Sequence, residues 1–500
     1  MRIRHFPDKG QFTALAQHHN VVPICIEVLA DTETPVSLLK KLHDGRRAIF
    51  LFESVEGGER WGRYSFLGTN ARSHIRVFRD AVVIEENGDT TRTPHNGDPL
   101  AVLKAVAGRY RMAEMAGLPR FLGGLVGYMN YEMVSFFEAI PNRLAPDTPL
   151  AHFIIPDELL IFDNIRHTLT AATVVFIAPE DDPGRLFDDA LARTESLLAT
   201  IAATPLINGD DVPGPVVRIS PVVDAEAFRQ RVRTVKDHIY AGDIIQAVVS
   251  QPFVCDAPAD LWMLYRAQRF INPSPYLFFL HFDELALVGS SPEAMVRLEN
   301  RVATLRPIAG TRPRGRSEQE DRALADALLA DEKERAEHLM LVDLGRNDLG
   351  RIAETGTVQV TDLMVVERYS HVMHLVSNIS CDILDGKDAW DLIRATFPAG
   401  TLSGAPKIRA MEIIAELESS PRGPYGGAVG YVSFNGNMDM AITIRTAAVT
   451  GGKMIVRAGA GIVADSDPET ERQETVNKAM AIQNALQLMS GGDRPEGDQP

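Results

Sequence analysis

Short strand-like runs and longer helical runs follow one another along this chain without a regular strand–helix–strand repeat. In the N-terminal part, the strand-like runs are rich in β-branched and apolar residues and are bounded by turn residues, as strands are. They cover Ala48–Glu53, Ser73–Phe78, Leu159–Phe162 and Thr168–Ile177, with a helical run over Leu100–Met112.

The C-terminal part carries the clearest helix signals. Ser317 and Glu320 form a capping-box pair before a run to about Leu344, and Asp467-Pro468 opens a run over Glu469–Met489. Strands are expected over Ile245–Ser250, Tyr276–Phe282, Gly430–Phe434 and Ala441–Val449. This mixture predicts an α+β fold, a large two-layered β-sandwich with helices on the outside, rather than a Rossmann or barrel arrangement.

Turn residues concentrate in one internal segment, Ala203–Pro215, which holds three prolines. This segment is expected to separate a strand-rich N-terminal region, residues 1–205, from a second globular region, residues 217–490. Residues 206–216 are then a linker, and the tail, residues 491–500, is expected to be disordered.

The composition excludes several classes of function. Asp and Glu number 67 against 51 Lys and Arg, and the resulting net charge of −16 repels phosphate backbones, so no nucleic-acid partner is expected. Cys25, Cys255 and Cys381 stand far apart, a pattern that favours a reducing compartment and predicts a cytoplasmic protein. The chain has no apolar run long enough to span a membrane, and its first residues read as neither a signal nor a transit peptide.

Two pairs of glutamates have helical spacing. Glu334 and Glu337 lie three residues apart on the first long helical run of the second region, as do Glu471 and Glu474 on the last. This spacing puts both carboxylates of a pair on one helix face, which by itself is typical of a solvated charged surface. If all four met in one cleft, their repulsion would raise their pKa values or attract a cation, and Mg²⁺ is the cation that suits such oxygens best.

Glycine-containing turns and one pair of histidines are further candidates for binding and catalysis. The turns Pro307–Thr311, Pro398–Gly404 and Arg457–Gly461 have backbone N–H groups that a carboxylate can approach, but none has the spacing of a nucleotide-binding loop. His371 and His374 lack a third ligand of zinc type nearby, so a single histidine acting as acid or base fits better.

Together these segments resemble the family of chorismate-utilising enzymes, and within it the branch of anthranilate synthase component I. The resemblance runs from about Ile24 to about Leu488. It includes LFES at 51–54, GDIIQ at 242–246, NPSPY at 272–276 and KERAEHLMLVDLGRNDLG at 333–350. It implies intertwined regulatory and catalytic parts, with a feedback inhibitor bound by residues 1–205 and chorismate bound by residues 217–490.

The resemblance also implies roles for individual residues. The two glutamate pairs match an acidic site where Mg²⁺ clamps the ring carboxylate of chorismate. Glu293 matches the general acid that protonates the departing 4-hydroxyl, and His374 matches the histidine linked to the later loss of pyruvate. Arg445 and Tyr425 match residues that hold the enolpyruvyl carboxylate, with Thr401, a further catalytic candidate, beside them. The substrate-binding matches are Gly310, Thr311, Thr401, Tyr425, Arg445, Gly459, Ala460 and Gly461. Lys478, four residues after Glu474, either orients that carboxylate or forms a surface pair.

Two positions distinguish the branches of the family. Members that form isochorismate or salicylate carry a lysine that activates water where this chain has Gln246, whose amide has no basic lone pair. Many aminodeoxychorismate synthases use a lysine nucleophile where this chain has Ala309. Both differences favour attack of ammonia at carbon 2 and loss of pyruvate to give anthranilate, the first committed step of tryptophan synthesis.

A tryptophan feedback pocket is implied as well. Its residues are Glu53, Ser54, Pro275, Tyr276, Leu277 and Tyr431. Ser54 would hydrogen-bond the amino group of the effector, and Leu277 stands where the family usually has methionine, which affects affinity. Tryptophan is expected to shift the domains between two packings and so to lower the affinity for chorismate.

The source of ammonia is expected to be a partner. None of the three cysteines lies in a glycine-rich elbow like that of a glutaminase, so a separate glutamine amidotransferase subunit is expected. The two subunits are expected to form a hetero-oligomer, namely a heterotetramer. Three alternatives stay open: component I of aminodeoxychorismate synthase, an enzyme that stops at 2-amino-2-deoxyisochorismate, and a non-catalytic tryptophan-binding regulator. A regulator is expected to have lost metal carboxylates or His374, and this chain keeps them all.

Overall fold

The computed structural model describes residues 1–54, 62–115, 119–205, 217–369 and 372–490. The predicted linker, the predicted tail and His371 lie outside these ranges. The chain is 33% helical and 36% strand, and the strands within the described ranges pair antiparallel, so the predicted mixture of helices and sheet is confirmed.

One series of antiparallel strands contains strands from both predicted regions. β3 pairs with β12, which sets Glu53 opposite Leu277. The series runs, in spatial order, through β1 (Arg2–Phe6), β2 (Val21–Leu29), β9 (Thr168–Phe176), β8 (Ala151–Asp163), β4 (Tyr64–Val77), β3 (Ile49–Glu53), β12 (Tyr276–Phe282), β13 (Leu285–Ser291), β22 (Thr446–Thr450), β23 (Lys453–Ile462) and β11 (Gln246–Asp256), with β10 (Ser220–Pro221) and β19 (Gly404–Ala405) beside β11.

A second antiparallel series shares the long strands β4 and β8 with the first. The register of β4 against β8 shifts between Ala71 and Ser73, where β4 passes from its partner β3 to its partner β5. Its further members are β6 (Asp89–Pro94), β5 (Ala81–Glu86), β7 (Gly124–Met129), β20 (Ala428–Ser433), β21 (Met438–Ile442), β14 (Ala294–Glu299), β15 (Val302–Leu305), β18 (Val372–Asp382), β16 (Ile308–Pro313) and β17 (Gln359–Arg368).

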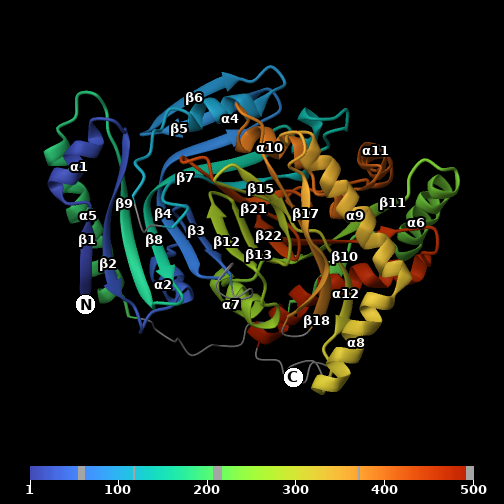
Figure 1. The fold of residues 1–500 in the computed structure, drawn as a ribbon. Coiled ribbons are helices and arrows are strands. Elements are labelled where there is room, and N and C mark those ends of the chain that lie inside the picture. The colour runs from blue at the N-terminus through green and yellow to red at the C-terminus, as the bar shows by residue number, and fades with distance from the viewer. Residues whose placement is uncertain (55–61, 116–118, 206–216, 370–371, 491–500) are drawn as a thin grey trace.

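The helices lie outside the strands (Figure 1). α1 and α5 cover β2 and β9 near the N-terminus, α12 packs on β23, and α9 packs on β16 and β18. The helices are α1 (Lys9–Ala16), α2 (Pro35–Leu42), α4 (Pro99–Ala107), α5 (Pro183–Ala203), α6 (Ala225–Tyr240), α7 (Leu261–Ile271), α8 (Glu318–Ala330), α9 (Glu332–Gly350), α10 (Ala389–Thr396), α11 (Lys407–Leu417) and α12 (Pro468–Met489), with 3₁₀ turns η1 (Tyr131–Phe136) and η2 (Gly400–Leu402).

Several predicted elements need correction. The strands predicted over Ser73–Phe78 and Leu159–Phe162 are only pieces of the longer strands β4 and β8. The single helix expected from Ser317 to Leu344 is two helices, because Asp331 ends α8 and caps α9 with its side chain. The strand expected over Ala441–Val449 is divided into β21 and β22. The helix expected over Leu100–Met112 ends at Ala107, before Gly108.

The three cysteines are unpaired and buried, as expected for a chain without disulfides. Within the described ranges, no helix has the length and apolar character needed to cross a membrane.

Candidate active site

A cavity of about 630 Å³ brings together most of the predicted site residues. It lies between α9, α12 and the ends of strands from the second region. Its walls include the catalytic candidates, the four glutamates and every predicted substrate-binding residue except Ala460, which are Glu293, Gly310, Thr311, Glu334, Glu337, His374, Thr401, Tyr425, Arg445, Gly459, Gly461, Glu471 and Glu474. Residues far apart in the sequence therefore share one site, as the resemblance implied.

The acidic wall is formed by two helices. Glu334 and Glu337 lie on α9, and Glu471 and Glu474 lie on α12. Burial, and to a smaller extent the charge of Glu334, raises the pKa of Glu337. Burial and the nearby Glu474 likewise raise the pKa of Glu471. The two glutamate pairs, whose spacing alone is typical of a solvated surface, therefore lie partly buried in the wall of one cavity.

These carboxylates suit a hard divalent cation. The donors are all carboxylate oxygens, and the raised pKa values of Glu337 and Glu471 mean that a positive charge among them would be stabilising. Among the described residues, no three of these carboxylates yet have ligand atoms all within 4.8 Å of one another. The chemistry of the donor set fits Mg²⁺, although the carboxylates must approach one another to share it.

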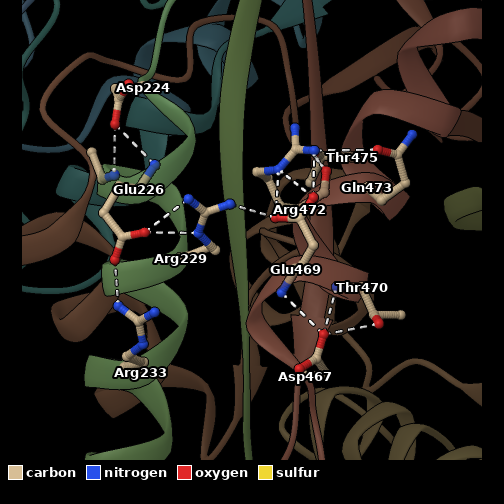
Figure 2. Close-up of polar contacts among 11 residues, drawn as sticks. Asp224, Glu226, Arg229, Arg233, Asp467, Glu469, Thr470, Arg472, Gln473 and Thr475 are labelled. Atoms are coloured by element: carbon tan, nitrogen blue, oxygen red, sulfur yellow. Dashed lines mark hydrogen bonds and ion pairs between the residues drawn. The ribbon is translucent and has the colours of Figure 1, made fainter.

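Contacts between α6 and α12 fix the first turn of α12 (Figure 2). The side chain of Asp467 caps α12 by accepting hydrogen bonds from the backbone N–H groups of Glu469 and Thr470. Arg229 of α6 pairs with Glu469 at 2.7 Å, and Arg472 pairs with the same carboxylate. Because Glu471 lies in this first turn and Glu474 lies one turn later, these contacts help to set their position in the cavity.

Lys478 also contacts the acidic wall. Its Nζ lies 2.6 Å from Glu474 Oε1 and donates to the backbone carbonyl of Gly459 at 3.0 Å. Of the two roles considered for Lys478, this contact supports the orienting one, since it joins the Glu474 carboxylate of α12 to the strand β23.

Glu293 is the most perturbed acid in the cavity. It follows β13, is buried, and accepts a hydrogen bond from the hydroxyl of Thr401 at 3.0 Å. Burial raises its pKa to about 8, although the Thr401 hydroxyl and the charge of Arg445 act in the opposite direction. Glu293 is therefore largely protonated at neutral pH, which is the state that a general acid needs.

His374 is held in one tautomer. Its Nδ1 lies 3.0 Å from the carbonyl oxygen of Gly310, which accepts a hydrogen bond and cannot donate one, so Nδ1 carries the proton. Burial lowers the pKa of His374, and the ring is neutral at pH 7 with a lone pair on Nε2. Such a histidine can accept a proton from a substrate.

A break between two strands exposes Arg445 to the cavity. The backbone of Arg445 has a φ of +49°, a left-handed conformation that ends the strand predicted to continue through it. Its carbonyl accepts hydrogen bonds from the backbone N–H of Ser290 at 3.3 Å and from Gln268 Nε2 at 3.5 Å. These bonds help stabilise the turn that places a guanidinium in the cavity.

Glycines of β23 allow close approach on the opposite wall. A Cβ on Gly461 would lie 2.5 Å from Gln246 Nε2, and a Cβ on Gly459 would lie 2.6 Å from the Tyr425 hydroxyl. Ala460, between them, is fully buried against the core because side chains alternate along a strand, so only its backbone borders the site. Gln246 uses the space by donating to Glu337 Oε1 at 3.1 Å.

Several cavity residues were missed from the sequence. Lys333 lines the cavity, and its position directly before Glu334 could have predicted this. Arg457 also lines it and bonds to Glu418, which Arg422 contacts from the other side. Although burial acts to raise it, these two guanidiniums hold the pKa of Glu418 at about 2. No spacing rule predicts such a buried triad.

A second, smaller cavity contains all six residues predicted to bind an effector. It lies where β3, β12 and β20 meet, and it has a volume of about 60 Å³. Its lining includes Glu53, Ser54, Pro275, Tyr276, Leu277 and Tyr431. This volume holds a few water molecules, so an indole ring requires the cavity to open.

Polar contacts close this small cavity. Arg120 donates to the Tyr431 hydroxyl at 3.0 Å and to Asp439 at 2.9 Å, while the Tyr276 hydroxyl donates to Asp439 at 3.0 Å. On another side, Tyr265 and Arg269 of α7 donate to Glu53, whose pKa is raised by burial.

A comparison with family models agrees with this geometry. The family described as chorismate binding enzyme matches residues 52–484. The chain belongs to this family. A chorismate-binding enzyme named anthranilate synthase component 1 from Pseudomonas putida is 47% identical to it, with 96% of this chain and 98% of that one covered. The protein of the same name from Acetivibrio thermocellus is 43% identical over the same shares of the two chains.

Solved structures of chorismate-binding enzymes have the same fold. Anthranilate synthase component I from Streptococcus pneumoniae TIGR4 superposes with a TM-score of 0.74 at 36% identity, covering 91% of this chain and 99% of that one. The menaquinone-specific isochorismate synthase MenF of Escherichia coli superposes with a TM-score of 0.68 at 20% identity, covering 96% and 98%, which shows the shared fold alone. The chain is an enzyme that acts on chorismate.

Proposed function

We propose that this chorismate-binding enzyme is the aminase component of an anthranilate synthase, which converts chorismate and ammonia to anthranilate and pyruvate. The observation that carries the proposal is the buried, protonated Glu293 in the same cavity as the neutral His374 and Gln246. The near full-length relatives named anthranilate synthase component 1 support the same reaction.

Chorismate would be held by its two carboxylates. Glu334, Glu337, Glu471 and Glu474 would hold Mg²⁺, which supplies charge neutralisation and orientation for the ring carboxylate. Arg445 and Tyr425 would bind the enolpyruvyl carboxylate, because a guanidinium and a phenol both donate hydrogen bonds to carboxylate oxygens. The close approach of Gly459 to Tyr425 fixes the phenol at that end of the cavity.

Two proton transfers follow from the two buried groups. Glu293 gives its proton to the 4-hydroxyl, which leaves as water while ammonia attacks carbon 2 and the ring double bonds shift; the new ammonium group then loses one proton to solvent. Nε2 of His374 accepts the proton from carbon 2, the carbon–oxygen bond to the enolpyruvyl group breaks, and the released enolate takes up a proton to give pyruvate. The carbonyl of Gly310 keeps the proton on Nδ1, which leaves Nε2 as the base.

Gln246 and Ala309 support ammonia rather than water or an enzyme amine as the nucleophile. The amide nitrogen of Gln246 donates to Glu337 and cannot remove a proton from water. Ala309 lines the cavity with a methyl group, where a lysine would be needed for covalent attack. Aminodeoxychorismate synthase and aminodeoxyisochorismate synthase are the alternative activities for the same cavity, whereas a non-enzymatic tryptophan-binding regulator does not agree with membership of this family of enzymes.

Regulation and assembly are part of the proposal. L-Tryptophan would bind at the small cavity with its amino group near Ser54, and a separate glutamine amidotransferase subunit would supply ammonia in a cytoplasmic heterotetramer. The pairing of β3 with β12 supports the proposed two-layered sandwich with intertwined parts, in which residues 1–205 are regulatory and residues 217–490 catalytic.

The test compares nitrogen donors with the chain alone. Purified chain, chorismate and Mg²⁺ are mixed with either ammonium or glutamine, and anthranilate is followed by its fluorescence. Anthranilate from ammonium and none from glutamine supports both the activity and the need for a partner. No anthranilate from either donor, by a folded chain, would remove the proposal.

A further inference from the structure

Two histidines and one aspartate meet on a part of the molecule away from the catalytic cavity. His74 Nδ1 and His152 Nε2 lie 3.1 Å apart. Asp283 places Oδ1 at 3.8 Å from His74 Nδ1 and Oδ2 at 4.0 Å from His152 Nε2. Within the described part of the chain, this is the group of three metal-ligating side chains whose ligand atoms all lie within 4.8 Å of one another.

The fold brings the three residues together from separate segments. His74 lies on β4 and His152 on β8, two strands that pair along their length. Asp283 lies in the turn between β12 and β13, with a φ of +51°, a conformation that fixes the tip of this hairpin. His74 and His152 are 78 residues apart in the sequence, and Asp283 follows His152 by 131 residues, so no local sequence motif predicts the group.

The electrostatic surroundings leave the group able to accept a cation. The ring nitrogens His74 Nδ1 and His152 Nε2 face each other at hydrogen-bond distance, so one of them carries the hydrogen of this contact. A change of tautomer moves that hydrogen to the other nitrogen of its ring and frees both facing lone pairs for a metal ion. Arg76 donates to Asp283 and also pairs with Glu85, so one positive group faces two negative ones. Arg76 thereby orients the carboxylate as outer-shell partners of metal ligands do.

We propose that His74, His152 and Asp283 form a site for a zinc-type divalent metal ion, with water as the fourth ligand. Two imidazole nitrogens and one carboxylate are a donor set that suits Zn²⁺. At bond lengths of about 2.0–2.1 Å, tetrahedral ligand atoms stand about 3.3 Å apart. The three ligand atoms, one from each residue, all lie within 4.8 Å of one another, so each separation reaches that geometry with a change of about 1.5 Å or less.

The proposed ion would have a structural role. It would fasten the β12–β13 turn to β4 and β8, because its ligands come from these three segments. Neither histidine and neither oxygen of Asp283 borders the catalytic cavity, so the site is separate from the four glutamates proposed to hold Mg²⁺.

Zinc binding to the full chain tests the proposal. The chain is saturated with Mg²⁺ to occupy the glutamate cavity, and Zn²⁺ is then titrated by calorimetry, with the visible absorption of bound Co²⁺ as a second readout of nitrogen ligands in tetrahedral geometry. One equivalent of Zn²⁺ is expected to bind the wild type and to raise its melting temperature.

Variants then assign the site. Asp283→Asn keeps a residue that tolerates the left-handed turn, and it is expected to weaken Zn²⁺ binding by at least about tenfold, as is His152→Gln. His43→Gln is the matched control, because His43 pairs with another histidine, His281, at 2.9 Å and is not one of the three ligands. The affinity of the His43→Gln variant for Zn²⁺ should therefore equal that of the wild type.

Two results would overturn the proposal. One is a wild type that binds no Zn²⁺ once Mg²⁺ is saturating, and the other is a folded Asp283→Asn variant that binds as the wild type does. Because Asp283 is 41% exposed, its replacement by Asn is compatible with folding, and the test does not depend on the buried His152. No arm of the experiment uses catalytic activity, so it is independent of the proposed reaction.

Discussion

The hydroxyl of Thr401 donates a hydrogen bond to Oε1 of Glu293 at 3.0 Å inside the catalytic cavity. Thr401 lies in η2, whereas Glu293 lies between β13 and β14, 108 residues earlier in the chain. The bond orients a carboxyl group whose pKa burial has raised to about 8. The proposed acid is thus both protonated at neutral pH and held in one orientation.

Catalysis should be lost as the pH rises through the pKa of Glu293. The protonated acid is the active form, so kcat should fall as the pH rises above about 8. Replacement of Glu293 by Gln, which keeps the shape but has no acidic proton, should lower kcat by about 10²–10⁴-fold. Steady-state rates measured across pH check both expectations, and a variant with wild-type kcat would contradict the role of this residue.

Stability should depend on the same group with a defined sign. The pKa of Glu293 is raised on folding from 4.5 to about 8, so its contribution to the free energy of unfolding is fully present below pH 4.5 and is lost as the pH rises toward 8. The Glu293→Gln variant should therefore lose less stability than the wild type between these pH values. Denaturant unfolding at several pH values measures the free energy of unfolding of both proteins. The same dependence on pH in the wild type and in the variant would contradict this prediction.

Removal of the Thr401 hydroxyl should move the alkaline limit of activity upward. The hydrogen bond from Thr401 lowers the pKa of Glu293, so a Thr401→Val variant should have an acid with a still higher pKa. Its pH–rate profile should be displaced to higher pH, with a lower kcat from the less ordered carboxyl group. A displacement toward lower pH would mean that the bond does not stabilise the ionised form.

A methyl group at Gly461 should disturb Gln246. The new Cβ would lie 2.5 Å from the amide nitrogen of Gln246, which would then leave Glu337. We expect a Gly461→Ala variant to fold and to lose at least about tenfold in kcat/KM for ammonia, because a misplacement of about 1 Å in an active site has large effects. Gly350→Ala is the control, since a Cβ there meets no atom within 4 Å. Equal activity of both variants would show that the contact of Gly461 with Gln246 has no catalytic consequence.

Magnesium dependence should follow the carboxylates of α9 and α12. Replacing Glu337 by Gln removes one donor and one negative charge, so the Mg²⁺ concentration giving half-maximal activity should rise by at least about tenfold. Glu332→Gln, at the exposed start of the same helix α9, is the comparison, because Glu332 is not a cavity residue. An unchanged Mg²⁺ requirement in the Glu337 variant would exclude that residue as a ligand.

The sequence predicted what depends on local spacing. The i, i+3 pairs of glutamates, the capped start of α12 and strands such as β12 follow from periodicity and end signals over a few residues. The break at Arg445 was missed because strand propensity continues through it, and hydrogen bonds from Ser290 and Gln268, distant in sequence, stabilise the turn. Tertiary contacts outweighed local preference there.

Contacts between segments that are distant in the sequence could likewise not be predicted from the spacing of residues. The buried Arg457–Glu418 pair joins residues 39 apart, and His74, His152 and Asp283 meet only after β4 has paired with β8 and the β12–β13 turn has packed beside them. The resemblance to the chorismate-utilising enzymes supplied the assignment of the cavity residues, since each motif alone was too short to assign a role.

The identity and ratio of the products test the central claim most directly. The chain is given chorismate, Mg²⁺ and ¹⁵N-labelled ammonium, and the products are identified by mass and quantified. The account predicts ¹⁵N-anthranilate and pyruvate in equal amounts. Accumulation of 2-amino-2-deoxyisochorismate without pyruvate would contradict the role of His374, and 4-amino-4-deoxychorismate would contradict the use made of Gln246 and Ala309.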